Sequence, residues 1–167
     1  MTASTIRRLE PRDIPDCERV LRSLPEWFGI ESANQQYIRD LETLPAYVAE
    51  WEGRLVGFLA INQQTSDAAE LHIIAVLAEI RGKGIGQSLL DAAETDLRAQ
   101  GVSLLQVKTL GPSNPDDGYR QTRESYEMMG FLPLEETTAF WGPDNPTLVM
   151  VKVLRIDNWV GSDGWPI

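Results

Sequence analysis

Three closely spaced glycines in the middle of the chain lie beside two cations, and this combination suits the binding of a phosphate group. Gly82, Gly84 and Gly86 occupy alternate positions, beside Arg81 and Lys83. Glycine adopts positive φ easily and leaves backbone N–H groups uncovered, while the two cations supply charge-assisted donors. The segment predicts an anion site with a phosphate as its ligand. The alternative is a glycine-rich turn with solvated cations.

The elements on either side of this loop favour the phosphate. Glu70–Val76 is an apolar, β-branched run typical of a buried strand, and Gly84–Gln100 has helical periodicity. A helix N-terminus carries roughly half a positive charge and free N–H groups, so it attracts anions. The glycines fit neither a P-loop, which needs Lys-Ser or Lys-Thr, nor the Gly-x-Gly-x-x-Gly of a dinucleotide fold.

Two motifs together resemble those of the GNAT superfamily, the acyl-CoA-dependent N-acyltransferases. Arg81–Gly86 is similar to the family's pyrophosphate loop, Arg/Gln-x-x-Gly-x-Gly/Ala, and Tyr126–Phe131 is similar to its Tyr-x-x-x-Gly-Phe helix end. The two motifs occur in the family's order, and between them they cover roughly the middle and C-terminal half of the chain. The resemblance implies acetyl-CoA as the co-substrate and an amine as the acceptor.

The resemblance also implies where the co-substrate would lie. The pyrophosphate of CoA would sit on the glycine-rich loop, and its pantetheine arm would pair with the backbone of the preceding strand. The cofactor-binding residues expected on this basis are Ile74, Ala75, Val76, Arg81, Gly82, Lys83, Gly84, Ile85 and Gly86.

By the same resemblance, Tyr126 would be the general acid that protonates the leaving thiolate; otherwise it is a packing residue with one hydrogen bond. Many family members carry Asn and Ala earlier on this helix, where the present chain has Tyr119 and Thr122. The Asn usually contacts pantetheine or the loop. Ser113 or Asn114, in the preceding loop, is expected to replace that contact.

Two residues of the central strand are candidates for the general base that deprotonates the amine. Glu70 and His72 lie on one face of the strand with Ile74 and Val76, because side chains alternate with a period of two. By its position relative to Val76, Glu70 matches the base of some family members, while His72 has an imidazole, which titrates near neutrality. The alternatives are an exposed carboxylate at a strand end and a hydrogen-bonded structural histidine.

Composition limits the classes of protein to which the chain can belong. Its 167 residues suit one domain, here residues 1–155 followed by a tail at 156–167, and its net charge is −10. That charge argues against nucleic acid and an anionic membrane as partners, and it attracts a cationic substrate or simply maintains solubility. With one cysteine and one histidine, neither a disulfide nor a metal site is expected. The N-terminus lacks a signal-peptide core, so a cytoplasmic location is expected.

The coarse pattern of elements agrees with the motifs. Strands are expected at 5–9, 46–51, 54–62, 70–76, 102–110 and 147–154, with one beginning at 131, and helices after residues 11, 32, 84 and 119. This order predicts an α/β (α+β) GNAT fold with a mixed, mostly antiparallel sheet of six or seven strands. The predicted fold also contains about four helices and one parallel strand pair after the central strand.

Acceptor binding is the least specified part of the prediction. By analogy with relatives, the walls of the acceptor site would include Trp27, Phe28, Phe140 and Trp141, which equally suit core packing or a subunit contact. A small molecule or a peptide could supply the amine. Two tryptophans in the tail at 156–167 are expected to dock on this domain or on a second subunit, as in a homodimer.

The sequence therefore predicts an N-acyltransferase, most simply an N-acetyltransferase, in which the amine attacks the thioester directly in a ternary complex. One alternative is a non-catalytic acyl-CoA sensor on the same fold. The other is a nucleotide-binding module that uses the same loop.

Overall fold

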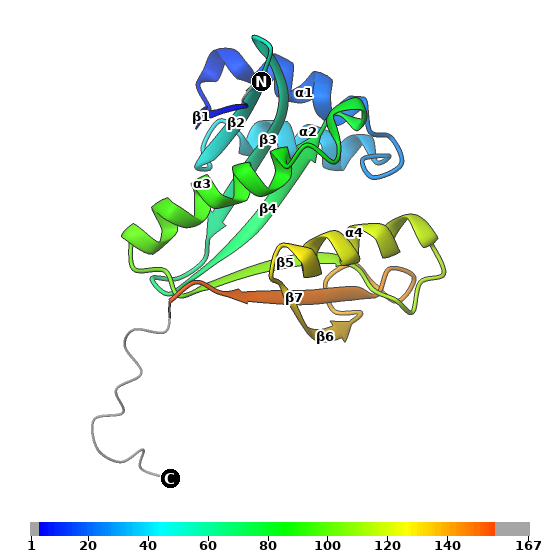
Figure 1. Ribbon diagram of the computed structural model, residues 1–167. Coiled ribbons are helices and arrows are strands. Elements are labelled where there is room, and N and C mark those ends of the chain that lie inside the picture. The colour runs from blue at the N-terminus through cyan, green and yellow to red at the C-terminus, as the bar shows by residue number, and fades with distance from the viewer. Residues whose placement is uncertain (1–3, 156–167) are drawn as a thin grey trace, which may run out of the picture.

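A computed structural model describes residues 4–155 as one seven-stranded sheet with helices on both faces (Figure 1). The strand order is β1-β2-β3-β4-β5-β7-β6. The strands are β1 (Thr5–Arg8), β2 (Ala46–Trp51), β3 (Arg54–Gln63), β4 (Ala68–Val76), β5 (Leu104–Leu110), β6 (Leu132–Thr137) and β7 (Thr147–Val153).

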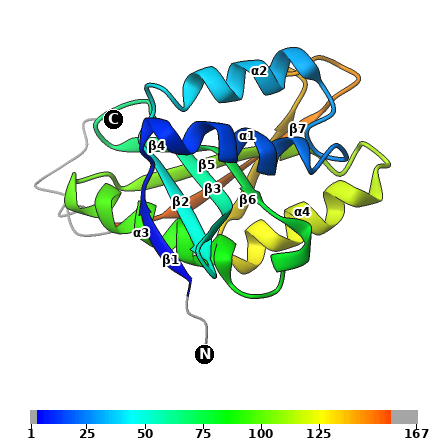
Figure 2. The same cartoon turned by 90° about the horizontal axis from the view of Figure 1, so that it is seen from above.

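The helices form two layers around the sheet. They are α1 (Ile14–Arg22), α2 (Glu31–Asp40), α3 (Ile85–Ala99) and α4 (Asp117–Met128), with short 3-10 turns at Pro11–Asp13 and Ala78–Ile80. Seen from above, α1 and α2 lie on one side of the sheet, and α3 and α4 lie on the other (Figure 2). None of the helices within residues 4–155 combines the length and apolar character that a bilayer span requires.

Alternation of side chains along β4 determines which residues face the core. Its odd-numbered residues from Ala69 to Ala75 are buried, whereas Glu70, His72, Ile74 and Val76 are only half-buried. Helix α3 contributes its apolar face to the same core, through Ile85, Leu89, Leu90, Ala93 and Leu97. The predicted common face of the four half-buried residues is confirmed.

The parallel pair β4–β5 is very short. Pairing joins Ala68 to Leu104, Ala69 to Leu105 and Glu70 to Gln106, and no later residue of β4 pairs with β5. Beyond this point β4 continues alongside β3 as far as Val76, while β5 runs on alongside β7. The two strands therefore diverge toward their carboxyl ends, as Figure 1 shows.

The predicted fold class is confirmed, including the mixed sheet, the four helices and the single parallel pair. Some boundaries differ. Strand β4 begins at Ala68 rather than Glu70, and α2 begins at Glu31 rather than after Ser32. The predicted docking of the tail at 156–167 lies outside the described residues.

Close approach of β3 to β4 requires glycine at position 57, which lies opposite Val76. A Cβ at Gly57 would lie 2.9 Å from the carbonyl oxygen of Ala75. We expect Gly57→Ala to lower the free energy of unfolding by about 1–3 kcal/mol through overpacking, although alanine ordinarily costs less backbone entropy than glycine. Urea denaturation measures this change. A free energy of unfolding equal to or above that of the unmodified protein would contradict it.

Candidate active site

Between β4 and α3, the glycine-rich loop takes the conformation that its glycines permit. Gly82 and Gly84 both have φ of +77°, and no heavy atom lies within 4 Å of a Cβ built at either. Gly84 is the residue before the first turn of α3. Left-handed backbone at these two positions turns the chain sharply into the helix and leaves its inner side open.

The N–H groups of this loop are unoccupied within the described part of the chain. No acceptor among residues 4–155 bonds the N–H groups of residues 82–87, and the next amide, that of Ser88, donates to the carbonyl of Gly84 at 3.0 Å. Neither Arg81 nor Lys83 forms an ion pair with another described residue; the Arg81 guanidinium lies 4.4 Å from the ring centre of Trp27. A run of free donors at a helix start, beside two unneutralised cations, can hold a diphosphate.

Divergence of β4 and β5 leaves backbone groups of β4 without a partner strand. The N–H of Leu77 donates to the carbonyl of Val56 at 2.8 Å, so Leu77 and Val56 form a hydrogen-bonded pair. Such pairs alternate in an antiparallel ladder. Val76 and Ile74 therefore direct their N–H and C=O groups away from β3 and into the crevice, whereas Ala75 directs its groups toward Phe58 of β3.

At its start, α3 packs closely against both sides of this crevice. A Cβ at Gly86 would lie 3.2 Å from Cε of Met129 and 3.7 Å from Cδ1 of Ile74. A glycine at this position thus lets the first turn of α3 approach the residue that ends α4 and the exposed edge of β4.

Tyr126 projects from α4 and is half-buried beside the ring of Phe131, with ring centres 5.8 Å apart. Burial is the main cause that raises the pKa of Tyr126 above its ordinary value of 10, and the phenols of Tyr37 and Tyr119 raise it further. No described residue forms a hydrogen bond with its hydroxyl. Tyr126 therefore stays a protonated phenol at neutral pH, as a general acid must.

Glu70 is engaged in an ion pair at the point where β4 and β5 separate. Its Oε2 lies 2.6 Å from Nζ of Lys108 on β5, and both side chains are 14% exposed. The same oxygen accepts a hydrogen bond from Nε2 of Gln64 at 3.0 Å. The Lys108 ammonium also lies 4.8 Å from the ring centre of Phe140. This oxygen could accept a proton only at the expense of the ion pair.

The side chain of His72 is held from the α2 side of the sheet. Its Nε2 lies 2.8 Å from Oδ2 of Asp40, and both side chains are about one-fifth exposed. The ring of Tyr37 packs edge-on against the imidazole, with centres 5.5 Å apart. His72 is therefore an oriented imidazole on the half-buried face of β4, close to the crevice.

Trp27 links three segments around the mouth of the crevice. Its indole Nε1 donates a hydrogen bond to Oγ1 of Thr122 on α4 at 3.1 Å. The guanidinium of Arg81 stacks over its ring in a cation–π contact. The predicted acceptor wall and the predicted phosphate loop thus touch each other through one side chain.

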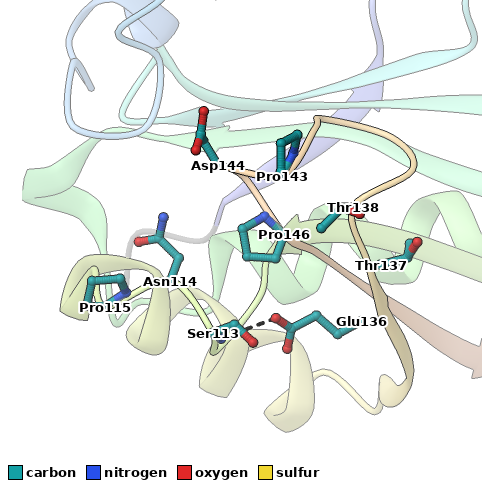
Figure 3. A pocket seen from close by; sticks show the side chains of 9 residues that line it. All are labelled: Ser113, Asn114, Pro115, Glu136, Thr137, Thr138, Pro143, Asp144 and Pro146. Carbon is teal, nitrogen blue, oxygen red and sulfur yellow. Dashed lines mark hydrogen bonds between the residues drawn. The ribbon is translucent and has the colours of Figure 1, made fainter.

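Ser113 and Asn114 line a cavity at the start of α4 and the end of β6. With Glu136 of β6, Asp144 of the β6–β7 connection and neighbouring residues they line an open cavity of about 710 Å³ (Figure 3). The backbone N–H of Ser113 donates to Oε1 of Glu136 at 3.3 Å. None of the other predicted cofactor-binding residues lines this cavity, and a contact of Ser113 or Asn114 with pantetheine stays a prediction.

Several residues of the site were not predicted. Tyr37 and Asp40 both face His72, and their i, i+3 spacing on one helical face was the available signal. Lys108 shares a face with Gln106, the partner of Glu70, through the period of two. Residues 4–155 contain no cluster of three or more His, Cys, Asp or Glu side chains that could hold a metal ion.

A family model for the acetyltransferase (GNAT) family matches residues 13–131, which include the phosphate loop and Tyr126. The chain belongs to the GNAT family. Two curated relatives match parts of this GNAT domain. An uncharacterized N-acetyltransferase of Chlorobaculum tepidum is 36% identical over 92 residues, 54% of this chain and 56% of that protein. An amino-acid acetyltransferase of Pseudomonas fluorescens is 38% identical over 82 residues, 48% of this chain and 19% of that protein.

Solved structures share the same GNAT architecture. A GNAT-family protein from Desulfovibrio desulfuricans has a TM-score of 0.81 at 21% identity, covering 92% of this chain and all of that one. The ribosomal-protein-S18-alanine N-acetyltransferase of Escherichia coli has a TM-score of 0.75 at 18% identity, with 95% and 98% covered. An aminoglycoside 6'-N-acetyltransferase complexed with coenzyme A has a TM-score of 0.72 at 20% identity, with 90% and 97% covered.

The four tyrosines of the chain give a spectroscopic test of their burial. Burial is the first cause that raises the pKa of Tyr37, Tyr47, Tyr119 and Tyr126 above 10. Since the unfolded chain loses these protons more readily, their stabilising contribution is complete below pH 10 and declines as the pH rises above it. We expect tyrosinate absorbance of the native protein to rise at higher pH than that of the protein in guanidinium. Coincident titration curves would contradict this expectation.

Proposed function

We propose that this GNAT protein is an N-acetyltransferase that moves an acetyl group from acetyl-CoA to a primary amine by direct attack. The observation that carries the proposal is the run of free N–H groups at residues 82–87, which lies at the end of a strand whose edge is open. A diphosphate on this loop would direct the attached pantetheine arm back along β4, between the diverging strands.

Contacts for each part of CoA are available in the crevice. Arg81 and Lys83 would neutralise the pyrophosphate, whose oxygens would accept from the loop amides. The amides of pantetheine would pair with the outward N–H and C=O groups of Ile74 and Val76, as an added strand pairs with a sheet edge. The thioester would then approach the junction of β4 and β5, near Glu70.

An amine acceptor suits the opposite side of the crevice. The side chains that gather there on α2 and β4 are aromatic or acidic, with the ring of Tyr37 packed against both Phe28 and His72. Aromatic faces and carboxylates attract an ammonium group. The relatives act, by their names, on amino acids, an aminoglycoside and a ribosomal-protein alanine. We infer that the acceptor is a small-molecule or peptide amine.

The proposed chemistry assigns one proton transfer to each side. His72 accepts the proton of the acceptor nitrogen, which then attacks the thioester carbonyl and forms the C–N bond. The C–S bond breaks, Tyr126 donates its proton to the leaving thiolate of CoA, and the resulting phenolate regains a proton from the newly bonded nitrogen, directly or through water. Glu70 is the alternative base, and in that role it would have to share Oε2 with Lys108.

A ligand screen tests the binding part of this proposal. Because only ligands of the folded state raise the melting temperature, acetyl-CoA and CoA should raise it more than ATP or NAD. Arg81→Gln should weaken acetyl-CoA binding about tenfold, the effect of losing one charged hydrogen bond. Arg54→Gln is the matched control, since Arg54 lies on an exposed surface beside Glu79 at 3.6 Å. Equal shifts by all four ligands would contradict the proposal.

Turnover tests the catalytic part. Thiol release from acetyl-CoA, measured over a panel of primary amines, should identify an acceptor. With that acceptor, Tyr126→Phe should lower kcat about 100-fold, the lower range for loss of a general acid, while acetyl-CoA binding is retained. Tyr47→Phe is the control, since the hydroxyl of Tyr47 donates to Asp96 away from the crevice. Unchanged kcat in Tyr126→Phe would remove this tyrosine from the mechanism.

A further inference from the structure

We propose that Asp40 is a positioning residue that orients His72 as the general base for the acceptor amine. The inference rests on the proposed acetyl transfer and adds to it a residue from α2, an element that neither motif includes. It is carried by the contact between Oδ2 of Asp40 and Nε2 of His72 at 2.8 Å.

Both oxygens of the Asp40 carboxylate are fixed. Oδ2 faces His72, and Oδ1 accepts a hydrogen bond from Nε2 of Gln36 at 2.7 Å. No Lys or Arg among residues 4–155 forms an ion pair with Asp40, so the imidazole is its one ionic partner in that part of the chain. The charge of the Asp40 carboxylate therefore acts on the imidazole of His72 and is not neutralised by a surface cation.

Packing fixes the imidazole as well. Tyr37 lies edge-on to the His72 ring at an interplanar angle of 66°, and Phe28 in turn lies edge-on to Tyr37 with ring centres 6.0 Å apart. A ring held by a hydrogen bond at one nitrogen and by an aromatic edge has little freedom to turn. The orientation of His72 thus depends on α2 and on the segment that precedes it.

The contact determines which nitrogen can act as the base. An ionised carboxylate only accepts hydrogen bonds, so the neutral imidazole carries its proton on Nε2 and leaves the lone pair on Nδ1. When Nδ1 takes a proton from the acceptor ammonium or through a water, the resulting imidazolium is stabilised by Asp40. One N–H bond breaks on the substrate and one forms on Nδ1.

Other ionisable groups near His72 are few and can be named. Tyr37 and Asp40 face it from α2, and Glu70 lies two residues before it on β4, paired with Lys108 from β5. Because Lys108 neutralises Glu70, Asp40 is the carboxylate beside the imidazole whose charge is not neutralised by a Lys or Arg among the described residues. Removal of that charge should therefore make the imidazolium less favourable and move the acid limb of the pH–rate profile to lower pH.

The tautomer can be measured directly, because His72 is the only histidine of the chain. Two-dimensional 1H–15N NMR of the untagged protein above neutral pH should show the proton on Nε2 and an unprotonated Nδ1. A proton on Nδ1 would overturn the proposal, with no need for a known acceptor.

Kinetics test the role in catalysis. Asp40→Asn keeps the shape of the side chain and removes its charge, so we expect kcat/KM to fall at least tenfold and its acid limb to move to lower pH. The melting-temperature shift with acetyl-CoA should be unchanged. Asp16→Asn is the control, because Asp16 forms an exposed i, i+3 pair with Arg19. In His72→Gln the acid limb should disappear.

The outcomes separate this inference from the function on which it rests. No transfer by the unmodified protein to any amine would overturn the proposed function and this inference together. Transfer with an Asp40→Asn profile that matches the unmodified protein would overturn the inference alone. Loss of the acid limb in Glu70→Gln, with its retention in His72→Gln, would likewise overturn it, since it would assign the base to Glu70.

Discussion

The end of parallel pairing between β4 and β5, after Glu70 and Gln106, is the constraint on which the rest of the site depends. Because β5 follows β7 from that point, Ile74 and Val76 direct N–H and C=O groups toward no neighbouring strand. Unpaired backbone groups in a half-buried crevice favour a ligand that can bond them. The ion pair between Glu70 and Lys108 spans the point where the strands separate and joins them there.

This geometry makes the site two-sided. Tyr126 belongs to α4 and the glycine-rich loop precedes α3, whereas Tyr37 and Asp40 belong to α2, which lies on the other side of the sheet (Figure 2). Residues from both layers of helices thus line the crevice, where the co-substrate and the acceptor of the proposed reaction would meet. Such an arrangement suits a ternary complex better than a covalent enzyme intermediate. Burial also raises the pKa of the lone thiol, Cys17, to about 12, so it is a poor nucleophile.

Local patterns in the sequence were sufficient for the fold and for the backbone conformation of the glycine-rich loop. Gly82 and Gly84 take the left-handed backbone conformation that glycine permits, and the period of two along β4 correctly grouped Glu70 with His72. The contacts that decide what those side chains do are long-range. His72 meets a residue 32 positions earlier, and Glu70 meets one 38 positions later. No local periodicity encodes such pairs, because they depend on how α2 and β5 pack against β4.

Amide NMR of the 15N-labelled protein during titration with acetyl-CoA tests the central claim most directly. We expect saturable shifts of the amides at residues 82–87 together with those of Ile74 and Val76, because the diphosphate and the pantetheine arm would bind these groups. Pantetheine alone should shift only the two strand amides. Saturable binding of acetyl-CoA that leaves the loop amides unshifted would contradict the account.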